Sequence, residues 1–330
     1  MLIQIKEDLF EGENFKGLNY LIQIASYKQR YELFVDLTLV QNCELYIKLD
    51  QADKEVLEQD FNRFVQEAAV PQYEITEVVS HQKSLSVDEA VRFLNQPFII
   101  LLENSNNDSH FMKAIIYHFG EHKIKIHLEN NWIKFGNMGG GENLRNVLTG
   151  IKNDFENLPK KSESYLRCFA VLDSDKSYEN MPIKPDKEKS LVFLNTHNVP
   201  FHVLEKREME NYLPDEVIAS VEDNFIELYL ALSPFQKDYF DLQFGFNKNR
   251  TDKNYDQRIL DFYKTVSNED WKILKNGIST DVYKKSFKTE FPKLFNHELV
   301  TRDTLLSRCS HHEGDPNELF NLVSEITNLL

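Results

Sequence analysis

Cysteine and glycine are scarce in this chain, and long apolar runs are absent. The 330 residues include 3 cysteines and 11 glycines. Three widely separated cysteines cannot supply the disulfide framework of a small secreted protein. No apolar stretch approaches the roughly 20 residues that a membrane-spanning helix needs, and the first residues lack the basic-then-apolar order of a secretory signal. These absences predict a soluble cytoplasmic protein with no membrane association.

Positive charge is also in short supply. The chain has 38 Lys and Arg against 53 Asp and Glu, which gives a net charge of −15. This balance argues against a protein that coats nucleic acid nonspecifically. It leaves a nuclease open, because bound divalent cations cancel part of the charge and a local basic face or a basic partner supplies the rest.

The order of strand-like and helix-like segments predicts an α/β protein with three regions. Residues 1–95 are expected to form a small α+β region without a chemical site. Residues 96–215 alternate strands and helices, which predicts right-handed βαβ units and a central, mostly parallel sheet flanked by helices. Residues 216–330 are expected to be helical.

The individual segments follow from their periodicity and their flanking turn residues. In the first region, strands are predicted at 31–40, 43–50 and 72–80, and a helix at 52–69. In the central region, strands are predicted at 98–103, 123–128, 167–173 and 201–205, with a short one before the glycines at 139–141. Helices are predicted at 109–119, 142–155 and 187–197, and further along the chain at 223–232, 256–265, 280–291 and 317–330.

Carboxylates follow three of the apolar runs in the central region. Glu103 ends the first run, Asp173 and Asp175 follow the second, and Glu210 comes shortly after the third. Because the carboxyl ends of parallel strands meet at one edge of a sheet, we expect these side chains to lie together. Close carboxylates repel one another unless they hold a cation, and hard oxygen ligands suit Mg²⁺ or Mn²⁺.

Simpler interpretations exist for each of these residues. Glu103 at a strand end usually faces water, and Asp173-Ser174-Asp175 is also typical of an Asp-rich turn. Alternate residues of an extended segment point to one side, so this spacing can also present two carboxylates to one cation. Asp108 is expected to cap the helix that follows it.

Two neighbouring segments suggest contacts with phosphate. Gly139, Gly140 and Gly141 precede a predicted helix, whose free N–H groups favour an anion; a tight strand-to-helix turn explains them equally well. No P-loop sequence follows. Lys206, or Arg207 beside it, is placed to stabilise negative charge in a transition state, although a solvated charge run is the plainer interpretation.

The helical region adds two weaker signals. Lys284, Lys285 and Lys288 share a helix face and are candidate nucleic-acid contacts, and a solvated face is the alternative. Cys309, His311 and His312 lie close together, but four well-spaced zinc ligands are missing. We interpret the histidines as surface residues at a helix end.

In their order and spacing, the pieces at residues 96–215 resemble a Toprim domain, the metal-dependent fold of topoisomerases, primases and OLD-family nucleases. The family pattern is an acidic residue after a first strand, a glycine turn, and an Asp-x-Asp after a later strand. Glu103, the three glycines, and Asp173 with Asp175 match it. The segment LEKREMENYLP resembles the part of OLD nucleases in which a glutamate precedes Asn-Tyr, which here is Glu210.

The chain departs from that pattern in two respects. The first motif usually has Gly directly after the Glu and an Asp soon after it, whereas Asn104 follows Glu103 and Asp108 is one place late. OLD nucleases also carry an ATPase domain, and this chain has no Walker A sequence. The resemblance therefore implies a free-standing Toprim protein that works with a separate ATPase in bacterial defence against phage.

We arrive at two hypotheses of different classes. The first is a Mg²⁺- or Mn²⁺-dependent nuclease acting on DNA or RNA, with Glu103, Asp173, Asp175 and Glu210 as ligands, Glu210 also as a base, and Lys206 as charge stabiliser. The alternative is a non-enzymatic interaction subunit that keeps the Toprim fold as a scaffold. Topoisomerase and primase functions are less well supported, because no nucleophilic tyrosine domain or template-binding module is evident. A homo-oligomer is left open.

Overall fold

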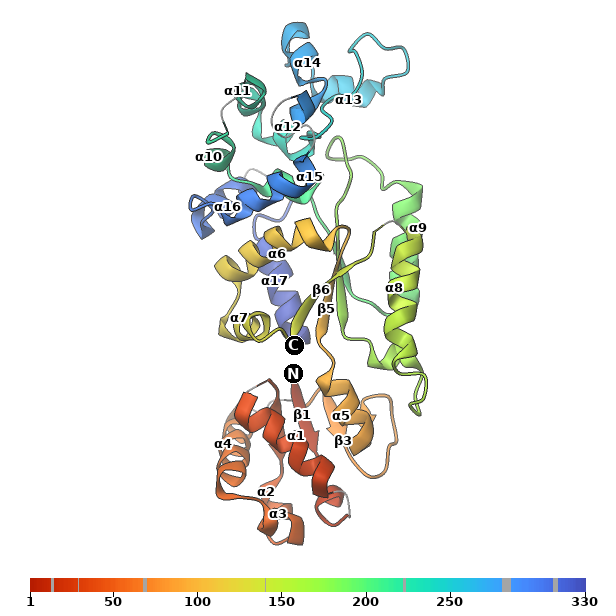
Figure 1. Cartoon of the computed structure of the whole chain (residues 1–330), viewed down its shortest axis with the longest axis vertical. Coiled ribbons are helices and arrows are strands. Elements are labelled where there is room, and N and C mark those ends of the chain that lie inside the picture. Colours follow the sequence, from red (N-terminus) through yellow and green to blue (C-terminus); the bar gives the residue numbers. More distant parts are fainter. Residues whose placement is uncertain are drawn as a thin grey trace.

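The computed structural model describes residues 1–12, 15–28, 30–67, 70–139, 141–221, 224–280, 286–310 and 314–330. Figure 1 shows an elongated molecule with a small lobe at the bottom, a central sheet, and a helical lobe at the top. In the described part of the chain, the strands form two sheets of four strands, and every pairing is parallel. The protein is therefore an α/β protein with helices flanking both sheets.

The N-terminal sheet has the strand order β2-β1-β3-β4. Its strands are β1 (Leu2–Ile5), β2 (Glu32–Val35), β3 (Tyr73–Ile75) and β4 (Ser84–Leu85). Its helices are α1 (Phe15–Lys28), α2 (Leu37–Val40), α3 (Glu44–Lys48), α4 (Gln51–Glu67) and α5 (Val87–Asn95). This lobe has a hydrophobic core of its own.

The central sheet has the order β6-β5-β7-β8. Its strands are β5 (Phe98–Leu102), β6 (Ile133–Asn137), β7 (Cys168–Leu172) and β8 (Phe201–Val203). The helices that connect them are α6 (Ser105–Phe119), α7 (His122–Glu129), α8 (Gly141–Asn153) and α9 (Pro185–Thr196). This part is the predicted βαβ alternation, and the short strand expected before the glycines is β6.

Both faces of the central sheet are covered. Successive side chains of β7 enter different cores: Val171 joins the core under α6, whereas Ala170 and Leu172 join the core under α8 and α9. Figure 1 shows α6 and α17 on one face of the sheet and α8 and α9 on the other. Burial on both faces explains why β5 and β7 read as continuous apolar runs in the sequence.

The C-terminal region is helical, as predicted. Its helices are α10 (Asp215–Ile218), α11 (Asn224–Ala231), α12 (Pro234–Tyr239), α13 (Gln257–Phe262), α14 (Asn268–Leu274), α15 (Phe287–Glu290), α16 (Arg302–Cys309) and α17 (Glu318–Leu329). This region also contains the short 3₁₀ helices η4 (Gly277–Thr280) and η5 (Phe291–Asn296). Earlier in the chain lie η1 (Glu7–Phe10), η2 (Ser162–Tyr165) and η3 (Met209–Tyr212). One hydrophobic core runs from this region to the α6 face of the sheet.

Two strand predictions were wrong. Residues 123–128 belong to helix α7, where the buried Ile124 and His127 are three positions apart. Residues 43–50 contain helix α3, in which Lys48 lies 2.5 Å from Glu44 one turn earlier. Short segments that alternate apolar and polar residues fit a strand and one helix face almost equally well, so the tertiary environment decides.

Two further predictions differ from the structure over part of their length. The strand expected at 31–40 ends at Val35, because the Asp36 side chain accepts the Thr38 N–H and begins helix α2. The helix expected at 280–291 falls partly on residues 281–285, outside the described residues. None of the helices in the described part of the chain combines the length and apolar character needed to cross a bilayer.

A substitution in α17 tests how strongly the C-terminal helix supports the fold. Leu322 is fully buried in the core that α17 shares with α6. Leu322→Ala should lower the free energy of unfolding by about 2–5 kcal/mol, measured by urea denaturation. Phe320→Ala on the exposed face of the same helix is the matched control. Equal stability of both variants would show that α17 does not contribute to this core.

Candidate functional site

Acidic residues gather at the carboxyl ends of β5 and β7. These two strands are neighbours, but the chain leaves β5 towards β6 on one side and leaves β7 towards β8 on the other. Such a reversal opens a crevice at the carboxyl ends of the two strands. Glu103 directly follows β5, and Asp173 directly follows β7. The pairing of Leu102 with Val171 puts Asp173 one residue beyond the position opposite Glu103, so the two carboxylates follow neighbouring strand ends with an offset of one residue.

A cavity of about 590 Å³ lies at this crevice, and we call it the acidic pocket. Four segments of the chain supply its carboxylates. They are Glu103, Asp108, Asp173, Asp175, Glu208, Glu210 and Asp241. The structure therefore brings together all four predicted acidic ligands, from strand ends and loops that are far apart in sequence. Arg207 and Lys288 are the cationic side chains that line the same cavity.

The Asp173-Ser174-Asp175 segment lies beyond the end of β7 and does not continue the strand. Asp175 has a φ of 55°, a left-handed conformation that Asp tolerates better than most residues. Its N–H donates to the Arg207 carbonyl at 3.0 Å. Asp173 accepts the Met209 N–H at 3.1 Å. The segment thus connects the end of β7 to the residues after β8, and both carboxylates line one pocket.

A lysine ammonium lies between two of the predicted ligands. Lys187, on α9, places its Nζ atom 2.8 Å from Glu103 Oε1 and 2.7 Å from Asp175 Oδ2. It also donates to the Asp173 carbonyl. Burial alone would lower the pKa of Lys187, but the charges and hydrogen bonds of Glu103 and Asp175 outweigh it and raise that pKa. The ammonium is therefore a resident cation at the acidic pocket.

Burial and neighbouring carboxylates raise the pKa values of Asp173, Glu208 and Glu210. Burial first, and then the charges of Glu103, Glu208 and Glu210, raise the pKa of Asp173 well above its usual range. Burial and the charge of Glu208 raise the pKa of Glu210 to about 8. Burial also raises the pKa of Glu208 to about 7, although Arg207 opposes it. Crowding of this kind favours protonation or the binding of a cation.

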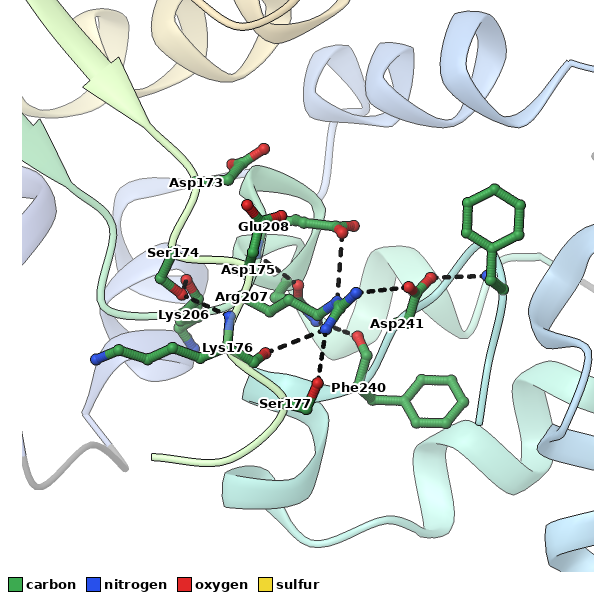
Figure 2. Close-up of polar contacts among 12 residues, drawn as sticks. Asp173, Ser174, Asp175, Lys176, Ser177, Lys206, Arg207, Glu208, Phe240 and Asp241 are labelled. Atoms are coloured by element: carbon green, nitrogen blue, oxygen red, sulfur yellow. Dashed lines mark hydrogen bonds and ion pairs between the residues drawn. The ribbon is translucent and has the colours of Figure 1, made fainter. Parts of the chain in front are cut away.

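Arg207 connects the pocket to the helical region. Its guanidinium lies 2.6 Å from Asp241 and 3.3 Å from Glu208, and donates to the Ser177 hydroxyl at 3.1 Å. Figure 2 shows the guanidinium at the centre of these contacts, with a further one to the Lys176 carbonyl. The Arg207 N–H donates to the Asp238 carbonyl at 2.9 Å. These contacts fix a positive charge in the wall of the acidic pocket.

Lys206 lies away from the acidic pocket. Its ammonium is fully buried, 2.5 Å from Asp238 and 2.7 Å from the Arg308 carbonyl. Burial and the charge of Arg308 lower its pKa to about 8. The predicted contact of Lys206 with a phosphate is therefore corrected: this lysine fastens the central sheet to the helical region, and Arg207 beside it faces the pocket.

The remaining predicted residues are distributed as follows. Gly139 lines the acidic pocket, has a φ of 47°, and donates its N–H to the Glu103 carbonyl at 3.1 Å. Gly140 lies outside the described residues, and Gly141 begins α8. Lys288 lines the pocket from α15. Lys284, Lys285, His311 and His312 lie outside the described residues. Asp108 accepts the Asn104 N–H at 2.7 Å and so closes the first turn of α6.

Sequence reasoning missed three residues of this site. Glu208 was visible only as part of a charge run after β8. Lys187 lies in the polar first turn of α9, and its sequence neighbours do not indicate a functional residue. Asp241 follows α12 in the helical region, where no apolar strand precedes it to point at a sheet edge. Only the folded chain brings these residues to the same place.

Carboxylate oxygens are suitable ligands for a hard cation, but the positions of these side chains do not match a metal-binding site. Among the described residues, no group of three His, Cys, Asp or Glu side chains is positioned to hold a metal ion. The Lys187 ammonium, between Glu103 and Asp175, provides a physical reason. Divalent cation binding at this place would require that ammonium to move and the carboxylates to turn inward.

Comparisons with known proteins give no assignment: no family model, curated protein or solved structure matches this chain. Any statement about function therefore depends on the site itself.

The raised pKa of Glu210 predicts a pH-dependent stability. Its folded pKa of about 8 exceeds the ordinary value of 4.5, so the folded chain holds this proton more tightly than the unfolded chain does. The resulting stabilisation is complete below the ordinary value and is lost as pH rises through the folded pKa. Glu210→Gln should therefore stabilise the protein at about pH 9 by on the order of 1 kcal/mol and flatten the decline from acidic pH.

The measurement is the melting temperature as a function of pH, from acidic pH to about pH 9, in the presence of a chelator. Glu216→Gln, at an exposed carboxylate on α10, is the control and should leave the profile unchanged. A wild-type melting temperature that rises steadily with pH would contradict the assignment.

Proposed function

We propose that this protein is a divalent-metal-dependent nuclease of Toprim type, which cleaves phosphodiester bonds of DNA or RNA. The observation that carries the proposal is the convergence of Glu103, Asp173, Asp175 and Glu210 on one cavity at the topological reversal of a parallel sheet. The order of these residues along the chain supports the Toprim relationship. We keep with it the expectation of a separate ATPase partner and a role in defence against phage.

The charges around the cavity suit a phosphodiester substrate. When bound, a divalent cation activates water and stabilises charge on phosphate oxygens. Glu103, Asp173 and Asp175 are the residues that would hold it. Arg207 and Lys288, which also line the cavity, offer positive charge to a phosphate. Glu210, with a pKa of about 8, exchanges a proton near neutral pH and suits general acid or base work.

A non-enzymatic scaffold is the second candidate. The observation that favours it is the Lys187 ammonium, which neutralises Glu103 and Asp175 without any metal. A chain that uses Lys187 only as a structural cation should neither bind Mn²⁺ nor cleave nucleic acid. The two candidates therefore differ in one measurable property, the response to divalent cations.

The first experiment is a cleavage assay. Purified protein is incubated with single-stranded DNA, duplex DNA or RNA, with Mn²⁺, Mg²⁺ or a chelator. We expect weak cleavage that depends on the cation and that rises when an ATPase-bearing partner is added. Asp173→Ala combined with Asp175→Ala should abolish cleavage and calorimetric Mn²⁺ binding without unfolding the chain. Equal Mn²⁺ binding by wild type and double variant would remove the basis of the proposal.

A second experiment concerns Lys187. Because its ammonium competes for Glu103 and Asp175, Lys187→Met should bind Mn²⁺ several-fold more tightly than wild type and should melt at a lower temperature without the cation. Lys189→Met on the same helix is the matched control, because Lys189 is exposed and its ammonium pairs with Asp186, one turn earlier on α9. Unchanged or weaker Mn²⁺ binding by Lys187→Met would show that the ammonium does not occupy the cation position.

A further inference from the structure

A second cavity lies directly beside the acidic pocket. It has a volume of about 310 Å³, at the lower end of the range for small-ligand sites. Arg207 and Asp241 line both cavities, so the two share a wall. We call this second cavity the aromatic pocket, because five aromatic residues of the helical region are among its lining residues: Tyr239, Phe240, Phe246, Tyr255 and Tyr263. Tyr255 is half-buried, and the other four are buried.

The rings of the aromatic pocket are held in place before any ligand arrives. Phe246 stacks on Trp271 with ring centres 3.7 Å apart and planes 12° apart. Tyr263 meets Phe246 edge-on at 4.9 Å. The Tyr255 hydroxyl donates to the Phe246 carbonyl at 2.8 Å, which fixes the angle of the Tyr255 ring. An ordered wall of this kind loses little side-chain entropy when a flat molecule binds against it.

Hydrogen-bonding groups surround this aromatic wall. Asn247, Lys248 and Asn254 line the pocket and are exposed at its mouth. The shared wall is Arg207, held by Asp241 and Ser177 (Figure 2). The pocket therefore suits a planar ring with donors and acceptors on its edge, attached to a group that carries negative charge toward Arg207.

We propose that the aromatic pocket receives one nucleobase of the polynucleotide whose phosphate is cut in the acidic pocket. The inference rests on the proposed function, because it assigns a substrate subsite to it. Stacking on aromatic rings occurs with every base, because every base has a π-face. In a chain with a net charge of −15, such stacking would add to the binding that Arg207 and Lys288 offer to phosphates. A base that is unstacked from its neighbours fits the pocket, which selects single-stranded or locally opened substrates.

The test uses a fluorescent base and no catalysis. The probe is a short single-stranded oligonucleotide that carries one 2-aminopurine, in a DNA and an RNA form, titrated with protein in the presence of a chelator. The competitor is the same strand with an abasic position in place of the 2-aminopurine. Wild type should quench the fluorescence and should bind the base-containing strand about tenfold more tightly than the abasic strand, the effect of one stacked base.

Two variants change the pocket in opposite ways. Tyr255→Ala removes a ring from the wall, and Asn254→Met narrows the mouth from an exposed position without adding a ring. Both should lose the quenching and the tenfold preference. Tyr117→Ala, at an exposed ring on α6, is the control and should retain both. Asn254→Met guards against misfolding of the Tyr255 variant, since it deletes no buried contact.

Each result of these titrations either supports or overturns the proposed subsite. Quenching by Asn254→Met equal to that of wild type, or no preference of wild type for the base-containing strand, overturns the subsite. Tight binding of a free mononucleotide at the level of the strand also overturns it, because the pocket would then serve a separate nucleotide. The wild-type protein separates the two proposals: base preference in the chelator, without Mn²⁺ binding or cleavage when the cation is added, supports the subsite and contradicts the nuclease proposal.

Discussion

The parallel pairing of β5 with β7 is the constraint from which the rest of the site follows. Because the two strands pair side by side and their connections leave in opposite directions, Glu103 and Asp173 follow neighbouring strand ends, offset by one residue, at the carboxyl ends of the sheet. Two carboxylates placed this close, with more arriving from the segment after β8, would repel one another strongly in a partly buried cavity. The remaining architecture can be understood as a response to that repulsion.

Three features reduce this repulsion: two cationic side chains and the protonation of carboxylates. Helix α9 supplies the Lys187 ammonium to Glu103 and Asp175. The segment after β8 supplies Arg207, which Asp241 of the helical region holds in turn. Protonation accounts for what is left, since burial and crowding raise the pKa of Glu210 to about 8. A site that concentrates negative charge and balances it only in part is suited to accept a further cation.

The helical region does more than cover the sheet. It shares a core with the α6 face, and its buried Asp238 is paired with both Lys206 and Arg308. The same region carries Asp241 and Lys288 into the acidic pocket and forms the aromatic pocket beside it. The proposed chemistry and the proposed base recognition therefore depend on one interface between sheet and helices.

The sequence predicted the parts of this structure that depend on local pattern. β5 and β7 were recognisable because strands buried on both faces are continuous apolar runs, and the carboxylates at their ends followed from the geometry of parallel sheets. The strand predicted at 123–128 was wrong because six alternating residues also fit the helix face that buries Ile124 and His127. β1 was missed, because four residues at the start of the chain give no period long enough to judge.

The candidate site likewise contains residues that local sequence pattern predicts and residues that it does not predict. Glu103, Asp173 and Asp175 are marked by the strands before them, whereas Lys187, Asp241 and the burial of Lys206 depend on contacts between distant segments. Lys206 and Arg207 are neighbours of similar charge, and only the packing against Asp238 decides which of them is buried. Long-range packing of this kind leaves no trace in local periodicity.

The most direct test of the account is a crystal structure of the protein soaked in Mn²⁺, with anomalous diffraction data to locate the metal. We expect an anomalous peak among Glu103, Asp173 and Asp175. The Lys187 ammonium should then have moved away from Glu103 and Asp175. A fully ordered structure with no peak in the acidic pocket at saturating Mn²⁺, and with Lys187 still between Glu103 and Asp175, would contradict the central claim that this carboxylate group is a cation-dependent site.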